Sequence, residues 1–326
     1  MTEPTQAAVD ADDALFRLAA AVRATGYRFV TATPATHARV NARPENTWAR
    51  GLEDVFGWSR PFRPEVLPSA VFDLMRRAGV AAPWGEGGWR SSVRLSTLGE
   101  ELFLHSAYPT AEPDAVFFGP DTYRFAAAIA AHLETRSSPV RRAADIGCGA
   151  GPGAILIAKA RPAATVLMGD INEAALRFAR INAMLAGAGN AAARRSDLLS
   201  GVPGGPLDLV VSNPPYLVDP AERAYRHGGG PLGAGLSLAI LDAALGRLAP
   251  GGTLLLYTGA AVVNGLDPFR AAAEERLAAD PGVGWSYREM DPDVFGEELD
   301  TPAYAEADRI AAVVLTVTRE GQQPHA

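Results

Sequence analysis

The chain has 326 residues, of which 48% are hydrophobic and 21% charged, and its formal net charge is −7. This length and composition suit two globular domains, and the acidity disfavours general binding of nucleic acid. No apolar run approaches the roughly 18–20 residues that span a bilayer, and residues 1–13 lack the basic flank and apolar core of a signal peptide, so we expect a cytoplasmic protein with no membrane partner.

The first hundred residues are predicted to form helices followed by a two-stranded hairpin. This order suggests a winged-helix-like domain over residues 1–105. The patterns predict helices over residues 12–25, 33–43, 47–56 and 64–78, and hairpin strands over residues 89–95 and 101–105.

The role of this domain has three interpretations. Winged helices often bind nucleic acid, but they also dock proteins, and a third possibility is simple packing as a lid. Four arginines, Arg76, Arg77, Arg90 and Arg94, are balanced by nearby acids, so no strongly basic face is expected.

Residues 106–122 are predicted to link two domains. Residues 114–118 have the composition of a short strand, and a turn follows at residues 119–122. Asp121 or Thr122 is expected to cap a helix over residues 123–133.

From Arg141 onward, strands and helices alternate regularly, which predicts a mostly parallel sheet covered by helices on both faces. A final pair of strands is expected over residues 283–289 and 309–317. The earlier strands are expected at residues 142–145, 165–169, 192–195, 207–212 and 252–257, and the helices at 153–160, 172–186, 236–248 and 268–279.

A glycine-rich turn follows the first of these strands. The sequence Asp145-Ile146-Gly147-Cys148-Gly149-Ala150-Gly151 is typical of a strand, a tight turn and a helix start, where a ligand lies against the backbone. Cys148 is the only cysteine of the chain. It excludes an intrachain disulfide and a cysteine-rich zinc site, and we interpret it as a small residue beside the ligand.

The sequence Asp208-Leu209-Val210-Val211-Ser212-Asn213-Pro214-Pro215-Tyr216 is the second informative stretch. Together the two stretches resemble the class I S-adenosylmethionine-dependent methyltransferases that methylate planar NH2 nitrogens. The resemblance implies a Rossmann-like α/β sheet, mostly parallel with the last strand antiparallel, over residues 123–320. It also implies S-adenosylmethionine as the cofactor, and no metal.

The expected cofactor residues follow successive strands, because ligands bind at the carboxyl edge of an open parallel sheet. Gly147, Gly149 and Gly151 would let the backbone lie beside the methionine moiety, with Cys148 between them. Asp145 is expected to meet the ammonium group of the methionine moiety.

The ribose and adenine are expected at the next two strand ends. Asp170 would accept hydrogen bonds from both ribose hydroxyls, although it could instead cap the following helix. Ile171 would pack on the adenine, Asp197 would meet its amino group, and Leu198 would border the ring.

The Asn213-Pro214-Pro215-Tyr216 motif is expected to do the chemistry, although Asn-Pro also marks ordinary turns. The side-chain oxygen of Asn213 and the carbonyl of Pro214 would accept the two N–H groups of a planar NH2 and draw its lone pair toward the methyl donor. The prolines restrict the turn, and Tyr216 offers a flat face for stacking.

The release-factor glutamine methyltransferases carry a Pro-Arg-Pro-(Glu or Asp)-Thr-Glu stretch before the cofactor domain. Pro120-Asp121-Thr122 matches its centre, so Thr122 joins the expected cofactor residues. The loop over residues 219–235 has glycines but lacks the family's Glu-Pro element. Its His227 is interpreted as a surface residue or a substrate contact, and residues 295–299 are expected to face the substrate.

Three functions fit these patterns. The first is N-methylation of a glutamine side-chain amide in a protein, such as a translation factor. The second is N-methylation of an exocyclic amine of adenine or guanine in RNA or DNA. The third is a non-catalytic cofactor-binding protein, which the intact Asn213 and glycines disfavour.

Overall fold

The predicted alternation forms one seven-stranded sheet in the computed structural model, which describes residues 5–223 and 225–321. The strand order is β7-β6-β5-β8-β9-β11-β10. Strands β5 to β9 pair in parallel, whereas β11 is antiparallel to both of its neighbours, so the predicted fold class is confirmed. The strands are β5 (Arg142–Ile146), β6 (Thr165–Asp170), β7 (Ala191–Arg195), β8 (Leu207–Ser212), β9 (Leu248–Val262), β10 (Val283–Asp291) and β11 (Arg309–Arg319).

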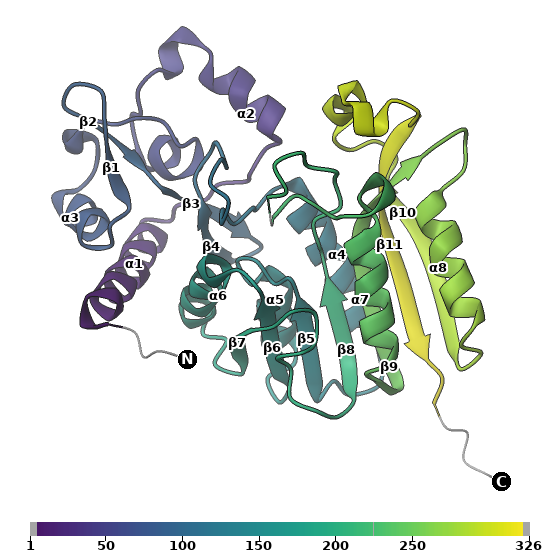
Figure 1. Ribbon diagram of the computed structural model, residues 1–326. Helices are drawn as coiled ribbons and strands as arrows, with labels where there is room; N and C mark the ends of the chain where they lie inside the picture. The colour runs from purple at the N-terminus through teal and green to yellow at the C-terminus, as the bar shows by residue number, and fades with distance from the viewer. Residues whose placement is uncertain (1–4, 224, 322–326) are drawn as a thin grey trace.

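Helices cover both faces of this sheet (Figure 1). Along β8, Leu209 and Val211 face one hydrophobic core and Val210 faces the other, as a two-residue repeat requires. Leu207 lies in the same core as Val210, because the pairing of β8 with β9 shifts register between Leu207 and Leu209. The first core includes α4 (Pro120–Thr135), α5 (Pro152–Ala160) and α6 (Glu173–Ala186), and the second includes α7 (Gly235–Leu245) and α8 (Pro268–Ala278). Within the described ranges, we find no helix with the length and apolar character needed to cross a bilayer.

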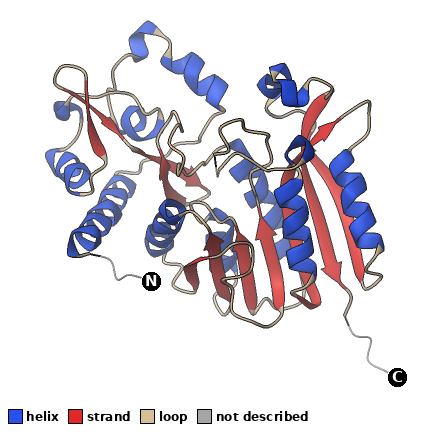
Figure 2. Ribbon diagram, in the orientation of Figure 1, coloured by secondary structure: helices blue, strands red, loops and turns tan. Residues whose placement is uncertain are grey.

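From residue 5 onward, the N-terminal part has three α-helices and two hairpins (Figure 2). Residues 1–4 of the predicted N-terminal domain lie outside the described residues. Whether this part binds nucleic acid or protein stays a prediction. The elements are α1 (Gln6–Ala24), α2 (Pro34–Asn41), α3 (Ser69–Arg77), and the antiparallel pairs β1 (Ala81–Trp84) with β2 (Gly88–Ser91) and β3 (Val93–Leu98) with β4 (Glu101–Ser106).

Several predicted boundaries in this part are wrong. Helix α1 starts earlier than expected, because Thr5 caps it by accepting from the N–H of Ala8. The helix expected over residues 64–78 begins only at Ser69, after Pro68, which cannot donate a backbone hydrogen bond. Residues 47–56 do not form the expected α-helix; a short π-helix spans Glu53–Gly57 instead.

The strand assignments also need correction. Trp89 belongs to β2, which pairs with β1 rather than with β4. Residues 114–118 form no strand. Val116 exchanges its backbone hydrogen bonds with Ser106 alone, donating to the Ser106 hydroxyl at 2.8 Å and accepting from its N–H at 3.1 Å, so no ladder continues from it.

A buried asparagine of α6 connects the N-terminal part to the glycine-rich turn. The side chain of Asn182 is fully buried and makes three hydrogen bonds. It accepts from the N–H of Leu104 at 2.8 Å and donates to the carbonyls of Leu104 at 3.0 Å and Ala150 at 2.9 Å. One side chain therefore joins β4 to the turn that follows β5.

We predict that Asn182→Ala lowers the free energy of unfolding by about 3 kcal/mol, because it leaves buried backbone groups without partners and opens a cavity. Urea denaturation measures the change. Met184→Ala is the matched control on the same helix, because Met184 is 58% exposed, and a change within about 0.5 kcal/mol is expected there. Equal effects of the two substitutions would contradict the role of Asn182.

Candidate active site

A cavity of about 210 Å³ lies at the carboxyl edge of the sheet. The loops after β5, β6, β7 and β8 line it, where a parallel sheet places its ligands. Gly151 does not line this cavity. The predicted site residues that do are Thr122, Asp145, Gly147, Cys148, Gly149, Asp170, Ile171, Asp197, Leu198, Asn213, Pro214, Pro215 and Tyr216.

Gly151 acts through packing. Its φ is 84°, and a Cβ atom there would lie 3.0 Å from the sulfur of Met168 and 3.3 Å from the Cβ of Ala179. The glycine therefore lets the start of α5 approach β6 and α6 closely, and it supports the turn from outside the cavity.

Asp170 holds the glycine-rich turn with its carboxylate. One oxygen accepts from the N–H of Gly149 and the other from the N–H of Asn172, both at 2.9 Å. Asn172, rather than Asp170, caps α6, because its side chain accepts from the N–H of Ala174. The alternative of Asp170 as a helix cap is therefore excluded. Burial raises the pKa of Asp170, although these N–H groups oppose the shift.

Asp145 is almost completely buried, with 2% of its surface exposed. One oxygen accepts from the N–H of Ala154 at 2.9 Å. Burial above all, together with the negative charge of Asp170, raises the pKa of Asp145 to about 7, although the N–H of Ala154 opposes the shift. Cys148 lies nearby and is also buried, and burial raises the pKa of its thiol. The thiol therefore stays neutral, which fits its interpretation as a small residue beside the ligand.

The remaining predicted cofactor residues lie at the edges of the cavity. Ile171 is 51% exposed and Asp197 is exposed, so both present their side chains to an incoming molecule. Leu198 is half-buried. The hydroxyl oxygen of Thr122 accepts from the N–H of Gly119 at 3.2 Å, so Thr122 helps to cap α4 as well as lining the cavity.

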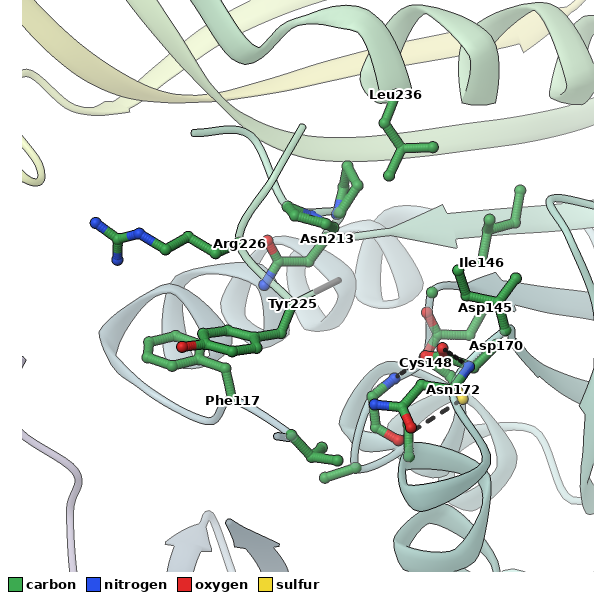
Figure 3. Close-up of a pocket in the computed structure, with 18 of the residues that line it drawn as sticks. Phe117, Asp145, Ile146, Cys148, Asp170, Asn172, Asn213, Tyr225, Arg226 and Leu236 are labelled. Carbon is green, nitrogen blue, oxygen red and sulfur yellow. Dashed lines mark hydrogen bonds between the residues drawn. The ribbon is translucent and has the colours of Figure 1, made fainter. Parts of the chain in front are cut away.

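Asn213 comes directly after β8. Figure 3 shows its amide directed toward the part of the cavity where Tyr225 and Phe117 lie, whereas Asp145 and Asp170 lie on the opposite side. Within the described residues, the Asn213 side chain makes no hydrogen bond. Its oxygen is therefore available to a ligand.

Tyr216 anchors the loop that carries Asn213. Its hydroxyl donates to one oxygen of Asp121 at 2.6 Å, and the hydroxyl of Tyr257 donates to the other at 2.7 Å. The Tyr216 ring packs against Gly259, where a Cβ would come within 2.2 Å of it, and the residue is only 6% exposed. Anchoring of the loop therefore accounts for Tyr216 better than the predicted stacking on a substrate.

Sequence reasoning missed several residues of this site. Asp121 was expected as a helix cap and as part of the Pro120-Asp121-Thr122 match, but not as the anchor of Tyr216. Tyr257 carries no local signal, because its partner is 136 residues away in the chain. Phe117, Tyr225 and Arg226 also line the cavity. The apolar pair at residues 117–118 and the loop between β8 and α7 were the available signals for them.

The loop after the motif is held by ion pairs. Both oxygens of Asp219 accept from Arg223, which lowers the pKa of Asp219 to about 2. Arg226 pairs with the buried Glu298. His227 does not line the cavity, and its ring nitrogen accepts from the N–H of Asp219 at 3.1 Å.

The loop over residues 295–299, which was expected to face the substrate, does contribute Phe295 to the cavity. The Phe295 ring lies edge-on to that of Tyr216, with their centroids 5.9 Å apart. This loop and the loop after the motif therefore meet beside the cavity.

The strand order and the loops that carry this site are those of the class I methyltransferase fold. The family model of the methyltransferase small domain matches residues 115–261. A release factor glutamine methyltransferase of Bordetella pertussis is 31% identical over 198 residues, which are 54% of this chain and 71% of that protein. The chain belongs to the family of the release factor glutamine methyltransferases.

Two further relatives extend the comparison. The release factor glutamine methyltransferase of Deinococcus radiodurans is 37% identical over 179 residues, covering 51% of this chain and 58% of that protein. A 4-amino-L-phenylalanine/4-methylamino-L-phenylalanine methyltransferase of Streptomyces pristinaespiralis is 34% identical over 153 residues, which are 43% of this chain and 52% of that protein. The chain spans about half the length of several of the curated relatives it matches.

The raised pKa of Asp145 predicts a pH-dependent stability for the protein without ligand. A carboxyl whose pKa is raised by folding binds more protons in the folded state, so its contribution to stability falls as pH rises from about 4 to about 7. We predict that Asp145→Asn exceeds the wild type in free energy of unfolding by about 4 kcal/mol at pH 8, and that this difference narrows toward pH 5. Denaturation across this pH range measures it. A difference that does not change with pH would contradict the assignment.

Proposed function

We propose that this protein transfers a methyl group from S-adenosylmethionine to the side-chain amide nitrogen of a glutamine in a protein. The observation that carries the proposal is a single cavity with a carboxylate-lined side and an opposite side formed by Asn213. A methyl donor and a planar NH2 group can therefore lie side by side in it.

The donor set fits S-adenosylmethionine. Asp145 would hold the ammonium group, since a cation compensates the cost of a buried carboxylate. Asp170 has each oxygen bound to only one N–H, which leaves lone pairs for the ribose hydroxyls. Ile171 and Asp197 would contact the adenine. When bound, the cofactor supplies a methyl group on a positively charged sulfur.

The side of the cavity that would hold the methyl-accepting amide needs two hydrogen-bond acceptors and no strong base. An amide nitrogen is a poor nucleophile because its lone pair is delocalised. The Asn213 oxygen and the Pro214 carbonyl would accept hydrogen bonds from its two N–H groups and hold the nitrogen in line with the methyl group. The C–S bond of the donor would break as the N–C bond forms, and one N–H proton would pass to solvent, which leaves a neutral N-methyl amide and a neutral thioether. The hydrogen bond between Tyr216 and Asp121 fixes this loop. The loop would therefore not have to become ordered each time a substrate binds.

The relatives favour a glutamine in a protein over a base in nucleic acid. Several of them are release factor glutamine methyltransferases. The net charge of −7 also suits a basic protein partner better than a polyanion.

A second candidate is the aromatic amino group of a small amino acid. The Streptomyces pristinaespiralis relative is named for such a substrate. In this chain Phe117, Tyr225 and Phe295 line the cavity, and aromatic walls suit a flat ring.

Two substitutions separate the roles of the two sides. We predict that Asn213→Ala lowers kcat about 10²- to 10³-fold, because one acceptor of the aligned N–H groups is lost, and that it leaves the Kd for S-adenosylmethionine nearly unchanged. Asp170→Ala should instead weaken cofactor binding at least about tenfold. Calorimetry and single-turnover assays measure both values. Unchanged turnover by Asn213→Ala would refute the proposed mechanism.

The substrate class is tested with labelled cofactor and a dialysed cell lysate. We expect label in macromolecules that survives RNase and DNase and disappears with protease, and mass spectrometry of the digested protein should place one methyl group on glutamine. Asn213→Ala enzyme is the matched control. Label that nucleases remove would favour a nucleic acid base. Label that appears only when 4-aminophenylalanine is added would favour the small-molecule candidate.

A further inference from the structure

A second, smaller cavity of about 20 Å³ lies beside the active site, among residues of the N-terminal part. Phe117 lines both cavities. Tyr225, from the active-site wall, donates its hydroxyl to the carbonyl of Thr110 at 2.5 Å, and Thr110 lines the smaller cavity. The two cavities therefore share a wall.

Arg94 lines this smaller cavity and is 5% exposed. Its Nε donates to the carbonyl of Gly57 at 2.8 Å, and its guanidinium lies 5.5 Å from the ring centroid of Phe29. In the part of the chain that the structure describes, its Nη2 has no hydrogen-bond partner, and no carboxylate forms an ion pair with it. By contrast, the buried Arg60 pairs with Asp54. A buried cation without a partner is costly, so an anion that accepts from Arg94 would stabilise this site.

His37 is the second polar residue in this cavity with an unpartnered atom. It is 1% exposed, and its Nε2 lies 2.8 Å from the carbonyl of Trp58, so Nε2 carries the proton. Its Nδ1 has no partner within the described residues. Burial, and then the charge of Arg94, lower the pKa of His37 to about 4. Both residues line the cavity, and each has one buried polar atom without a partner, so a group that accepts from Arg94 and shares a hydrogen with Nδ1 of His37 would satisfy both.

We propose that the cavity binds a carboxylate, which accepts from Nη2 of Arg94 while His37 takes up a proton at Nδ1. A single water molecule would fit the volume, but it would leave the charge of Arg94 uncompensated. The carboxylate comes either from the methyl acceptor, whose reacting nitrogen would lie across Phe117, or from a free small acid.

Formate tests the site directly. We expect a saturable rise in the thermal unfolding temperature with sodium formate, at constant ionic strength set with sodium chloride. Arg94→Met should raise the formate Kd about tenfold or more. Arg63→Met is the matched control. Its guanidinium lies 4.4 Å from the Trp48 ring centroid, but Arg63 does not line the cavity. No saturation in the wild type, or equal loss in both variants, would overturn the proposal.

The pH dependence tests it without any variant, in case Arg94→Met does not fold. The charges that act on His37 come from Arg94, Arg60 and Arg90, and the rings of Trp58 and Tyr108 pack on it. None of these groups titrates near neutral pH. His105 also lines the cavity, but both of its ring nitrogens have partners, the Ser96 hydroxyl and the Ser106 carbonyl, and burial lowers its pKa. Because binding takes up a proton, formate should bind more weakly as pH rises from about 5.5 to about 7.5. Affinity that is constant or rises over this range would contradict the role of His37.

Methyl-transfer kinetics assign the source of the carboxylate. This experiment rests on the proposed function, whereas the measurement of formate binding does not. Formate that raises the KM of the acceptor competitively, in the wild type but not in Arg94→Met, assigns the carboxylate to the acceptor. Formate that binds without changing this KM assigns it to a free acid. If methyl transfer is absent but formate binds through Arg94, the proposed function fails and the site stands.

Discussion

The carboxylate of Asp121 is the interaction on which the geometry of the active site depends. It is 4% exposed and accepts from the hydroxyls of Tyr216 and Tyr257, with Arg124 3.2 Å away. It therefore joins the start of α4, the loop after β8 and the long strand β9. Since Tyr216 is only three residues after Asn213, this anchor fixes the acceptor side of the cavity. Charge-assisted hydrogen bonds of this kind are strong enough to hold a loop without a helix or strand.

The donor side is held by different contacts. Asp170 binds the turn from within through the N–H of Gly149, and Asn182 binds it from outside through the carbonyl of Ala150. Asn182 also binds β4, so the N-terminal part supports the turn directly. The two sides of the cavity are thus positioned by separate networks. These networks are joined where β8 pairs with β5, because the Ser212 hydroxyl, directly before Asn213, donates to the carbonyl of Ile146 at 2.7 Å.

The sequence predicts the parts of this arrangement that are local. A glycine-rich turn and an Asn-Pro-Pro-Tyr stretch each contain their own backbone constraint, so both were located to the residue. Asp121 and Tyr257 could not be paired in this way, because only the folded sheet brings them together. The N-terminal helices were misjudged for a related reason: periodicity continues through Pro68, but the chain there lacks the N–H that a continuous helix requires.

Buried charge distinguishes the two cavities from the rest of the core. Among the described residues, the other fully buried carboxylates and guanidinium groups have charged partners, such as Asp219 with Arg223 and Arg60 with Asp54. Asp145 and Arg94 have no ion-pair partner within residues 5–223 and 225–321, and each lines a cavity. Folding alone gains nothing from either charge, because an apolar residue of similar size would be at least as stable. Both charges make physical sense if their partners arrive with ligands, a cation at Asp145 and an anion at Arg94. A methyl acceptor that carries a carboxylate would then be held at two points, and the wall at Phe117 would set the distance between them.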